Sequence, residues 1–286
     1  MRVPFEMVDV FAEAPFGGNQ LCVVAEPPDG LDDATMQALA LEIGFSETTY
    51  VTALRPDGYD VRIFTPEEEL PFAGHPTLGT AFVLARRHLI DAEATQHCGA
   101  GDVPVRIDVA HGRATMRQLP PTFGDTFDDR EAVARAASLR TEDLADDVPI
   151  VPVSTGIAHT MVAVRDEDAL RTAVRDDRAT ATVCERIDAE SLYLFTVRGD
   201  GDIRARMFDK GSQIGEDPAT GSAAGPLGAF LSVHRLAGMP GNVVIAQGEQ
   251  VGRPSFLDVE VAASADSWTI DVGGGVRWMG EGAFEL

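Results

Sequence analysis

Lysine is nearly absent from this sequence of 286 residues, in which Lys210 is the one lysine. Lysine and arginine together number 23 against 46 acidic residues, which gives a net charge of −23. A protein that binds nucleic acid needs clustered cations to contact phosphates, so this balance excludes a nucleic-acid partner. It also excludes most chemistry that depends on a lysine amine.

Cysteine is scarce as well, with three widely spaced residues, Cys22, Cys98 and Cys184, and no CxxC pattern. This excludes a disulfide framework and a zinc site of the usual spacing. The six histidines form no HExxH motif, so we expect no dedicated metal site.

Long apolar runs are also missing, and none approaches the length of a membrane span. The first residues, "MRVPFEMVDVFAE", carry acids inside their apolar stretch, which is not the pattern of a signal peptide. We therefore expect a cytoplasmic protein with no membrane partner.

What the sequence does contain is an internal repeat. The stretch "SETTYVTALRPDGYDVRIF" from Ser46 is similar to "AESLYLFTVRGDGDIRARMF" from Ala189, about half the chain length later. A length of 286 residues already favours two domains, and the repeat predicts that they are duplicated halves. The matched pairs are Glu47 with Glu190, Tyr50 with Tyr193, Asp57-Gly58 with Asp200-Gly201, and Thr77 with Thr220.

Each half combines strands and a helix in the same order. β-branched and aromatic runs joined through Asp-Gly predict a hairpin, and a Gly/Pro loop and a helix follow it. The two helices, in "AGHPTLGTAFVLARRHL" and "EDPATGSAAGPLGAFLSVH", are apolar nearly all round, so we expect each to run through or behind a sheet. Pro226 suits a helix interior poorly, so the second helix either begins late or kinks there.

Two other segments have a recognisable pattern. An amphipathic helix is expected after residue 30, capped by Asp32 or Asp33 and ended by Gly44. The acidic stretch 117–150 lacks strand alternation, and we interpret it as a solvated connection with one short helix near 130–139.

The two Gly/Pro loops precede helices, whose first N–H groups are unpaired and attract anions. Internal symmetry then predicts a cleft between the halves in which these helix ends bind a small carboxylate. Close packing of the helices is the alternative explanation for the glycines.

Acidic and imidazole groups lie beside these loops. Glu47 begins a strand of otherwise uncharged residues, which predicts a raised pKa suited to proton transfer. An exposed glutamate at the end of a strand would have the same sequence pattern. The repeat partner Glu190 allows the same two interpretations. His75 is a second candidate acid or base, or a helix cap. Asp217 and Ser222 flank the second turn, where helix capping is the simpler interpretation.

At these loops the sequence resembles the PhzF-like phenazine biosynthesis family, relatives of diaminopimelate epimerase. The resemblance extends from end to end, through "GGNQLCVV", "FSETTYV", "FAGHPTLG", "GEDPATGSAAG", "GEQVGRPS" and the final "VGGGVRWMGEGAFEL". It implies an α+β fold of two pseudo-symmetric domains, each a β-barrel-like sheet around a central helix. We expect an N-terminal half at 1–116, to which residues 275–286 can return, a connecting segment at 117–148, and a C-terminal half at 149–274.

The resemblance also implies a cofactor-independent isomerase that acts on a small carboxylic acid, of the dihydro-hydroxyanthranilate type in the phenazine enzymes, and forms a homodimer. The catalytic residues implied by the matching motifs are Glu47, His75 and Asp217. The substrate-binding residues expected around them are Asn19, Gly74, Thr220, Gly221 and Ser222.

Two other outcomes stay open. The same site can serve a hydro-lyase or racemase of a hydroxy or amino acid, since all three reactions remove a proton beside a carboxylate. The epimerase relatives use one cysteine in each loop, and neither loop has one here, which disfavours racemisation by two thiols. The other outcome is a catalytically silent binding protein that retains the fold.

Overall fold

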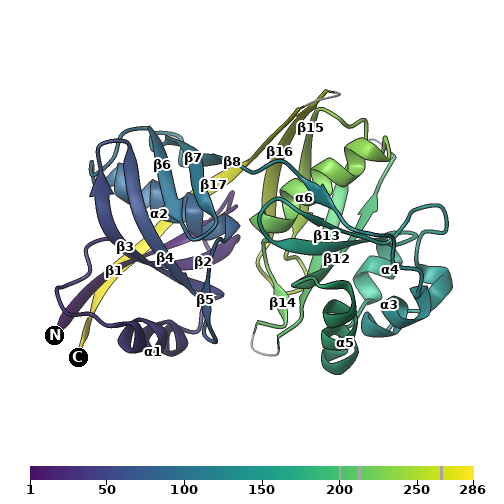
Figure 1. The fold of residues 1–286 in the computed structure, drawn as a ribbon, viewed down its shortest axis with the longest axis horizontal. Coiled ribbons are helices and arrows are strands. Elements are labelled where there is room, and N and C mark those ends of the chain that lie inside the picture. Colours follow the sequence, from purple (N-terminus) through teal and green to yellow (C-terminus); the bar gives the residue numbers. More distant parts are fainter. Residues whose placement is uncertain (200, 212–213, 265–266) are drawn as a thin grey trace. The chain divides into compact units, whose positions relative to one another are not determined.

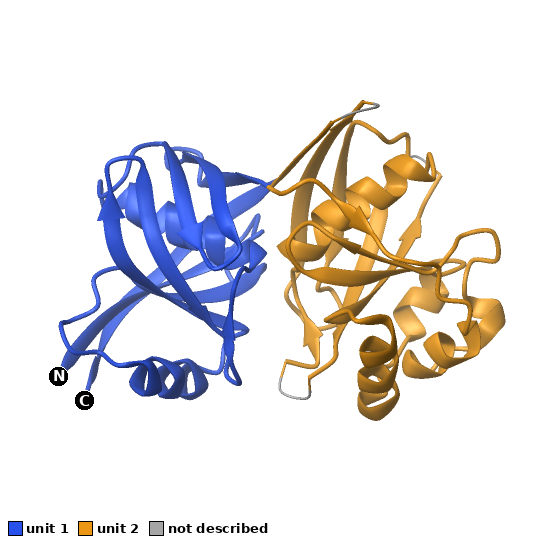
Figure 2. Cartoon of the chain, in the orientation of Figure 1, with its two compact units in different colours: residues 1–117, 273–286 blue, residues 118–272 orange. Residues whose placement is uncertain are grey.

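A computed structural model describes residues 1–199, 201–211, 214–264 and 267–286. The chain divides into two compact units, coloured separately in Figure 2. Unit 1 comprises residues 1–117 and 273–286, and unit 2 comprises residues 118–272. Asp200, which the sequence places in the second Asp-Gly turn, lies outside the described residues.

Unit 1 is a closed barrel. Its strands pair in the ring β1–β2–β3–β4–β6–β7–β8–β17, and β17 returns to β1, so that the two chain ends lie side by side (Figure 1). The elements are β1 (Arg2–Val10), β2 (Asn19–Val24), α1 (Asp33–Ile43), β3 (Glu47–Arg55), β4 (Gly58–Phe64), β5 (Glu69–Leu70), α2 (Gly74–Arg86), β6 (Glu93–Cys98), β7 (Gly101–Asp108), β8 (Arg113–Arg117) and most of β17 (Trp268–Glu285).

Helix α2 runs through this barrel, as its uniformly apolar sequence predicts (Figure 1). Every residue from position 74 to position 85 is buried. At Gly79 the strands come so close that a Cβ atom would lie 2.6 Å from Leu21 and 2.9 Å from Val10. Glycine is needed there to let the helix and the barrel wall approach, and α2 is thereby fixed inside the barrel.

Unit 2 repeats this order of elements. Its main sheet pairs in the order β10–β11–β12–β13–β15–β16–β17, and α6 packs against β10, β11 and β16. The elements are β9 (Thr122–Phe123), α3 (Arg130–Ala136), the 3-10 helix η1 (Thr141–Asp143), β10 (Val151–Ser154), β11 (Ala158–Ala163), α4 (Glu167–Thr172), α5 (Asp177–Ile187), β12 (Ser191–Val197), β13 (Ile203–Asp209), β14 (Glu216–Asp217), α6 (Gly221–Val233), β15 (Asn242–Gln247), β16 (Ser255–Ala263) and the first residues of β17.

The topology confirms the α+β fold and the duplicated plan. In unit 1 the hairpin β3–β4 is joined in parallel by β6, and in unit 2 the hairpin β12–β13 is joined in parallel by β15. A buried helix precedes the joining strand in each case. The parallel pairings β2–β3 and β11–β12 complete the correspondence.

The central helix of unit 2 begins at Gly221, three residues after Pro218, and continues through Pro226. A later start therefore does not account for Pro226, which lies inside the helix. At Gly225 an added Cβ atom would lie 1.9 Å from the side-chain oxygen of Gln118, so glycine is required for this contact. Gln118 also donates to the carbonyl of Gly221 at 2.8 Å and so holds the start of α6.

The helix expected after residue 30 is α1, with Asp32 as its N-cap and Gly44 in the left-handed conformation at its end. The expectation of a solvated connection at 117–150 is wrong. The predicted short helix is present as α3, but its alanines and Val133 lie in the hydrophobic core of unit 2 with Leu144. Small apolar side chains let α3 pack closely against α5, which the acidic composition of the segment conceals.

Candidate functional site

A buried polar cluster in unit 1 contains three of the residues proposed from sequence. Glu47 is the first residue of β3, His75 the second of α2, and Asn19 the first of β2. Nε2 of His75 lies 3.3 Å from Oε2 of Glu47, and Nδ1 of His75 lies 3.1 Å from the side-chain nitrogen of Asn19. The Glu47 side chain is 12% exposed and that of His75 4%. The structure thus brings together an imidazole and a carboxylate that has little contact with solvent.

The imidazole in this cluster is neutral near pH 7. Burial lowers the pKa of His75 from 6.5 to about 3. Ser46 donates to the side-chain oxygen of Asn19 at 3.3 Å, which leaves the Asn19 amide nitrogen to face Nδ1 of His75. Nε2 lies beside Glu47 at 3.3 Å, but this approach lacks the geometry of a hydrogen bond. The pair therefore places a neutral, polar ring against the carboxylate.

Unit 2 holds Asp217 in a chain of hydrogen bonds. The hydroxyl of Thr220 donates to Oδ2 of Asp217 at 2.6 Å, and Nε2 of Gln247 donates to the same hydroxyl at 2.9 Å. The hydroxyl of Tyr193 donates to Oε1 of Gln247 at 2.8 Å. The hydroxyl proton of Thr220 is thus used toward Asp217, whose side chain accepts it. The chain fixes the loop that leads into α6.

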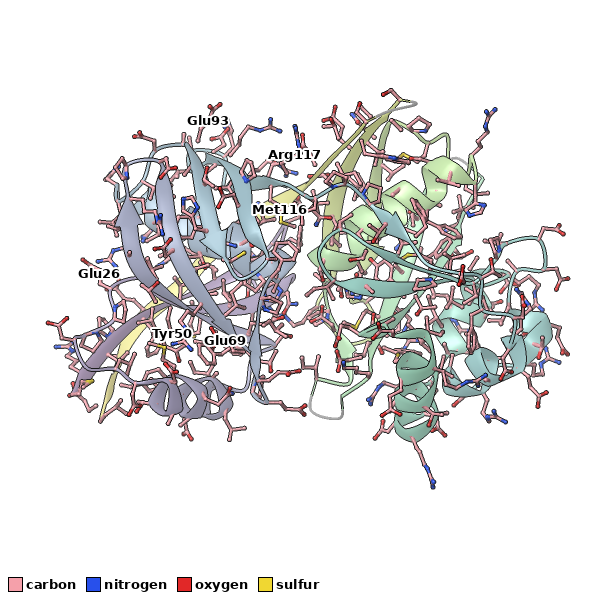
Figure 3. All side chains as sticks on the ribbon, in the orientation of Figure 1. Glu26, Tyr50, Glu69, Glu93, Met116 and Arg117 are labelled. Carbon is pink, nitrogen blue, oxygen red and sulfur yellow. The ribbon has the colours of Figure 1, made fainter. Side chains whose placement is uncertain are left out.

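The same Tyr–Gln–Thr arrangement occurs in unit 1. Tyr59 donates to Oε1 of Gln96 at 3.0 Å, and Nε2 of Gln96 donates to the hydroxyl of Thr77 at 2.7 Å. Thr77 and Thr220 are thus equivalent, as the repeat predicts. The tyrosine of this arrangement in unit 1 is Tyr59 and not Tyr50, the repeat partner of Tyr193. The hydroxyl of Tyr50, which is labelled in Figure 3, donates instead to the carbonyl of Met36 in α1.

Ser222, the second residue of α6, contacts a histidine. Its hydroxyl lies 3.0 Å from Nε2 of His159, and Nδ1 of the same ring lies 2.8 Å from the hydroxyl of Ser191. His159 and Ser191 face each other across the parallel strands β11 and β12. All three residues are buried, and burial lowers the pKa of His159 to about 3. Ser222 is therefore held by a neutral ring.

The N-termini of α2 and α6 differ from those of the other α-helices. An aspartate side chain caps α1, α3, α4 and α5, whereas the N-cap residues Ala73 and Thr220 make no side-chain cap. Gly74 and Gly221 are the first residues of these two helices. Uncapped N–H groups at a helix start suit an anionic ligand.

The capping interpretations of three candidate residues are wrong. Asp217 accepts from Thr220, Ser222 contacts His159, and His75 contacts Asn19; none of them is an N-cap residue.

The structure also separates the glutamates of the repeat. Glu190 is 42% exposed and pairs with Lys210, while Glu47 is nearly buried. Sequence reasoning missed His159, Ser191 and Gln247. A histidine within the apolar strand "AHTMVA" was the available signal for the first.

The cysteines lie in β2, β6 and α5, and none is at the start of α2 or α6. Burial raises the pKa of Cys22 and of Cys184 to about 12, which disfavours the thiolate. Within the described ranges, histidine, cysteine and acidic side chains nowhere form a group of three or more that could hold a metal ion. Across the same ranges, the helices are too short or too polar to cross a membrane.

Comparisons with known proteins give matches along nearly the whole chain. Residues 8–277 match the family described as phenazine biosynthesis-like protein. An uncharacterized isomerase of Clostridium acetobutylicum is 33% identical over 89% of this chain and 88% of its own. The trans-2,3-dihydro-3-hydroxyanthranilate isomerase of Pseudomonas fluorescens is 33% identical over 99% of each chain. A phenazine biosynthesis protein of the PhzF family from Bacillus anthracis superposes with a TM-score of 0.89 over 100% of both chains, at 26% identity.

Proposed function

The chain belongs to the phenazine biosynthesis-like protein family and is an isomerase of that family, and we propose that Glu47 is its general acid and base. The observation that carries this proposal is the 3.3 Å approach of His75 to a glutamate that is only 12% exposed. General acid–base catalysis needs a carboxylate held in a defined position beside the substrate, and Glu47 is the carboxylate of this cluster.

The proposed reaction moves one proton within a small carboxylic acid. The carboxylate of Glu47 takes a proton from one carbon, the electron pair of that C–H bond enters the adjacent conjugated system, and the double bond shifts. The carboxylic acid of Glu47 then returns the proton to another carbon. Composition and oxidation state are unchanged, so the step balances without a co-reactant. His75 faces the Glu47 carboxyl group with Nε2, at 3.3 Å, before and after the transfer.

Unit 2 supplies the anion-binding groups in this proposal. The N–H groups at the start of α6, at Gly221 and Ser222, and the hydroxyl of Ser222 are the donors for the substrate carboxylate. Asp217, held by Thr220, accepts from an amino or hydroxyl group of the substrate. In unit 1, Asn19 orients His75, and Gly74 lets the start of α2 approach a ligand closely.

The substrate of the Pseudomonas relative is the first compound to test, because its name describes a carboxylic acid of the required kind. Proton NMR in heavy water follows its rearrangement and the entry of deuterium with the wild-type protein, with Glu47→Gln and with Glu190→Gln. The last variant is the matched control, since Glu190 is the repeat partner of Glu47 but is exposed.

We expect rearrangement with deuterium incorporation by the wild type and by Glu190→Gln, and none by Glu47→Gln. Rearrangement at an undiminished rate in Glu47→Gln would overturn the assignment of the base. If the wild type leaves this compound unchanged, deuterium uptake into other small carboxylic acids, again compared with Glu47→Gln, identifies the substrate class.

A further inference from the structure

Ser222 is held in unit 2 by two residues to which neither the sequence motifs nor the family match assigns a role. His159 lies between Ser191 and Ser222 and contacts both hydroxyl groups. Its Nδ1 lies 2.8 Å from the hydroxyl of Ser191, and its Nε2 lies 3.0 Å from the hydroxyl of Ser222. Ser191 is fully buried, His159 is 2% exposed and Ser222 is 8% exposed. These contacts therefore form a line that begins in the core of the unit and ends at the first turn of α6.

The direction of the hydrogen bonds in this line follows from the buried end. Among the residues that the structure describes, His159 is the one hydrogen-bond partner of the Ser191 hydroxyl. A buried hydroxyl proton without an acceptor loses its hydration and gains nothing in return, so the Ser191 proton points to Nδ1. An imidazole that accepts at Nδ1 and is neutral carries its own proton on Nε2.

The consequence concerns the Ser222 hydroxyl. Nε2–H of His159 donates to its oxygen, so the hydroxyl proton of Ser222 is not used by the histidine. With the opposite tautomer, Ser222 would donate to Nε2 and would present only lone pairs to a ligand. A carboxylate accepts hydrogen bonds and repels lone pairs, so only the first arrangement suits an anion.

We propose that Ser191 and His159 are positioning residues that fix the Ser222 hydroxyl as a donor to the carboxylate of the substrate. This inference rests on the proposed function, because it deepens the role of Ser222 in anion binding. Burial keeps the ring neutral, since it lowers the pKa of His159 to about 3, and in a neutral ring the hydrogen bond at Nδ1 selects the tautomer. Neither residue needs to touch the substrate.

The first test reads the tautomer of His159 directly. Protein labelled with 15N-histidine gives long-range 1H–15N correlations that distinguish a protonated Nε2 from a protonated Nδ1, and the spectrum of His159→Gln identifies the signals of this ring. We expect the proton on Nε2 in the unliganded wild type. A proton on Nδ1 would overturn the proposal. The measurement needs no turnover, so its result stands whatever becomes of the Glu47 test.

The second test uses Ser191→Ala, which removes the hydroxyl that sets the tautomer. We expect the KM for trans-2,3-dihydro-3-hydroxyanthranilate to rise about tenfold, the effect of one hydrogen bond, with kcat little changed. If this compound is not turned over, the dissociation constant of anthranilate, a stable carboxylate of similar shape, replaces KM. An unchanged KM or dissociation constant would overturn the proposal.

A matched control and a rescue variant separate this role from a structural one. Ser232→Ala removes a buried serine from the same helix, whose hydroxyl donates to the carbonyl of Gly228 at 2.7 Å, and it should leave KM unchanged. Ser191→Thr retains the hydroxyl, so, unlike Ser191→Ala, it should keep the proton of His159 on Nε2 and keep the KM of the wild type. A threonine variant that folds and carries its proton on Nε2 but keeps the high KM would contradict the proposal.

Discussion

Nε2 of His75 lies 3.3 Å from Oε2 of Glu47, at a point where the start of helix α2 meets the start of strand β3. The barrel closes around α2, so both side chains are nearly removed from water. A neutral imidazole stands beside the carboxylate there without forming a full ion pair. The contact places a polar ring against Glu47 and limits the orientations of its side chain.

Replacing His75 by glutamine should slow the reaction without unfolding the protein. An amide can reach either Asn19 or Glu47 but does not hold both as a ring does, so we expect kcat to fall on the order of 10²-fold. Steady-state kinetics with circular dichroism as the check of folding measures this. His88→Gln, at the exposed end of α2, is the control and should retain full activity. A His75→Gln enzyme as fast as the wild type would show that Glu47 does not need this contact.

The two buried histidines should make the protein less stable in mild acid. The folded-state pKa of His75 and that of His159 are both lowered from 6.5 to about 3, so below pH 6.5 the unfolded chain binds protons that the folded chain does not. The free energy of unfolding therefore falls as the pH falls from 6.5 toward 3. Each histidine contributes up to about 1.4 kcal/mol per pH unit within this window.

Urea unfolding of the wild type and of His159→Gln between pH 7.5 and pH 5 measures this dependence. Titrating carboxylates affect both proteins alike, so the difference between them reports His159. We expect the free energy of unfolding of the variant to fall less steeply with decreasing pH. Parallel curves would mean that the ring is protonated without cost in the folded state.

The paired glutamines should matter for stability in both units. Gln96→Leu and Gln247→Leu each retain the approximate volume but remove the nearest acceptor of a buried tyrosine hydroxyl, that of Tyr59 or of Tyr193. The Tyr59 hydroxyl keeps a longer contact with the carbonyl of Thr77, at 3.4 Å, so its loss should be the smaller of the two. We expect each variant to lose roughly 1–3 kcal/mol of unfolding free energy, the cost of an unsatisfied buried polar group. Denaturant unfolding gives these values. A loss of unfolding free energy below about 0.5 kcal/mol would show that the network contributes little to stability.

Of these two glutamines, Gln247 is the one bonded to candidate site residues, since it donates to the hydroxyl of Thr220 and to the carbonyl of Asp217. Gln247→Leu is therefore expected to reduce turnover further than Gln96→Leu at equal loss of stability. Equal activities would indicate that Asp217 is held without this network.

Much of the fold could be predicted because the repeat carries local signals. The Asp57-Gly58 turn, the apolar helices and the caps at Asp32 and Gly44 are encoded in neighbouring residues, and the family resemblance is confirmed. The segment 117–150 was interpreted wrongly because acidic residues are interspersed among its alanines, so that the composition suggested a solvated segment. Which face of a short helix is buried depends on partners far along the chain, here α5.

The candidate sites were only partly accessible from sequence. Motifs identified Glu47, His75, Asp217 and Ser222, but capping was as good an explanation for the last two. For Ser222, the contact that decided against capping is with His159, a residue of β11 that the motifs do not contain. The homodimer, the domain limits and the roles of these residues stay predictions.

By itself the sequence determined the family, the duplicated α+β plan and the residues that border the two helix starts, because these depend on composition, periodicity and short motifs. Only the tertiary structure decided that the Glu47 side chain is 12% exposed and that of Glu190 42%, although both occupy the same place in the repeat. It also decided which neutral imidazole stands beside which hydroxyl or carboxylate. Burial and hydrogen-bond partners are set by residues distant in the chain, and these set the pKa values and donor directions on which the chemistry depends.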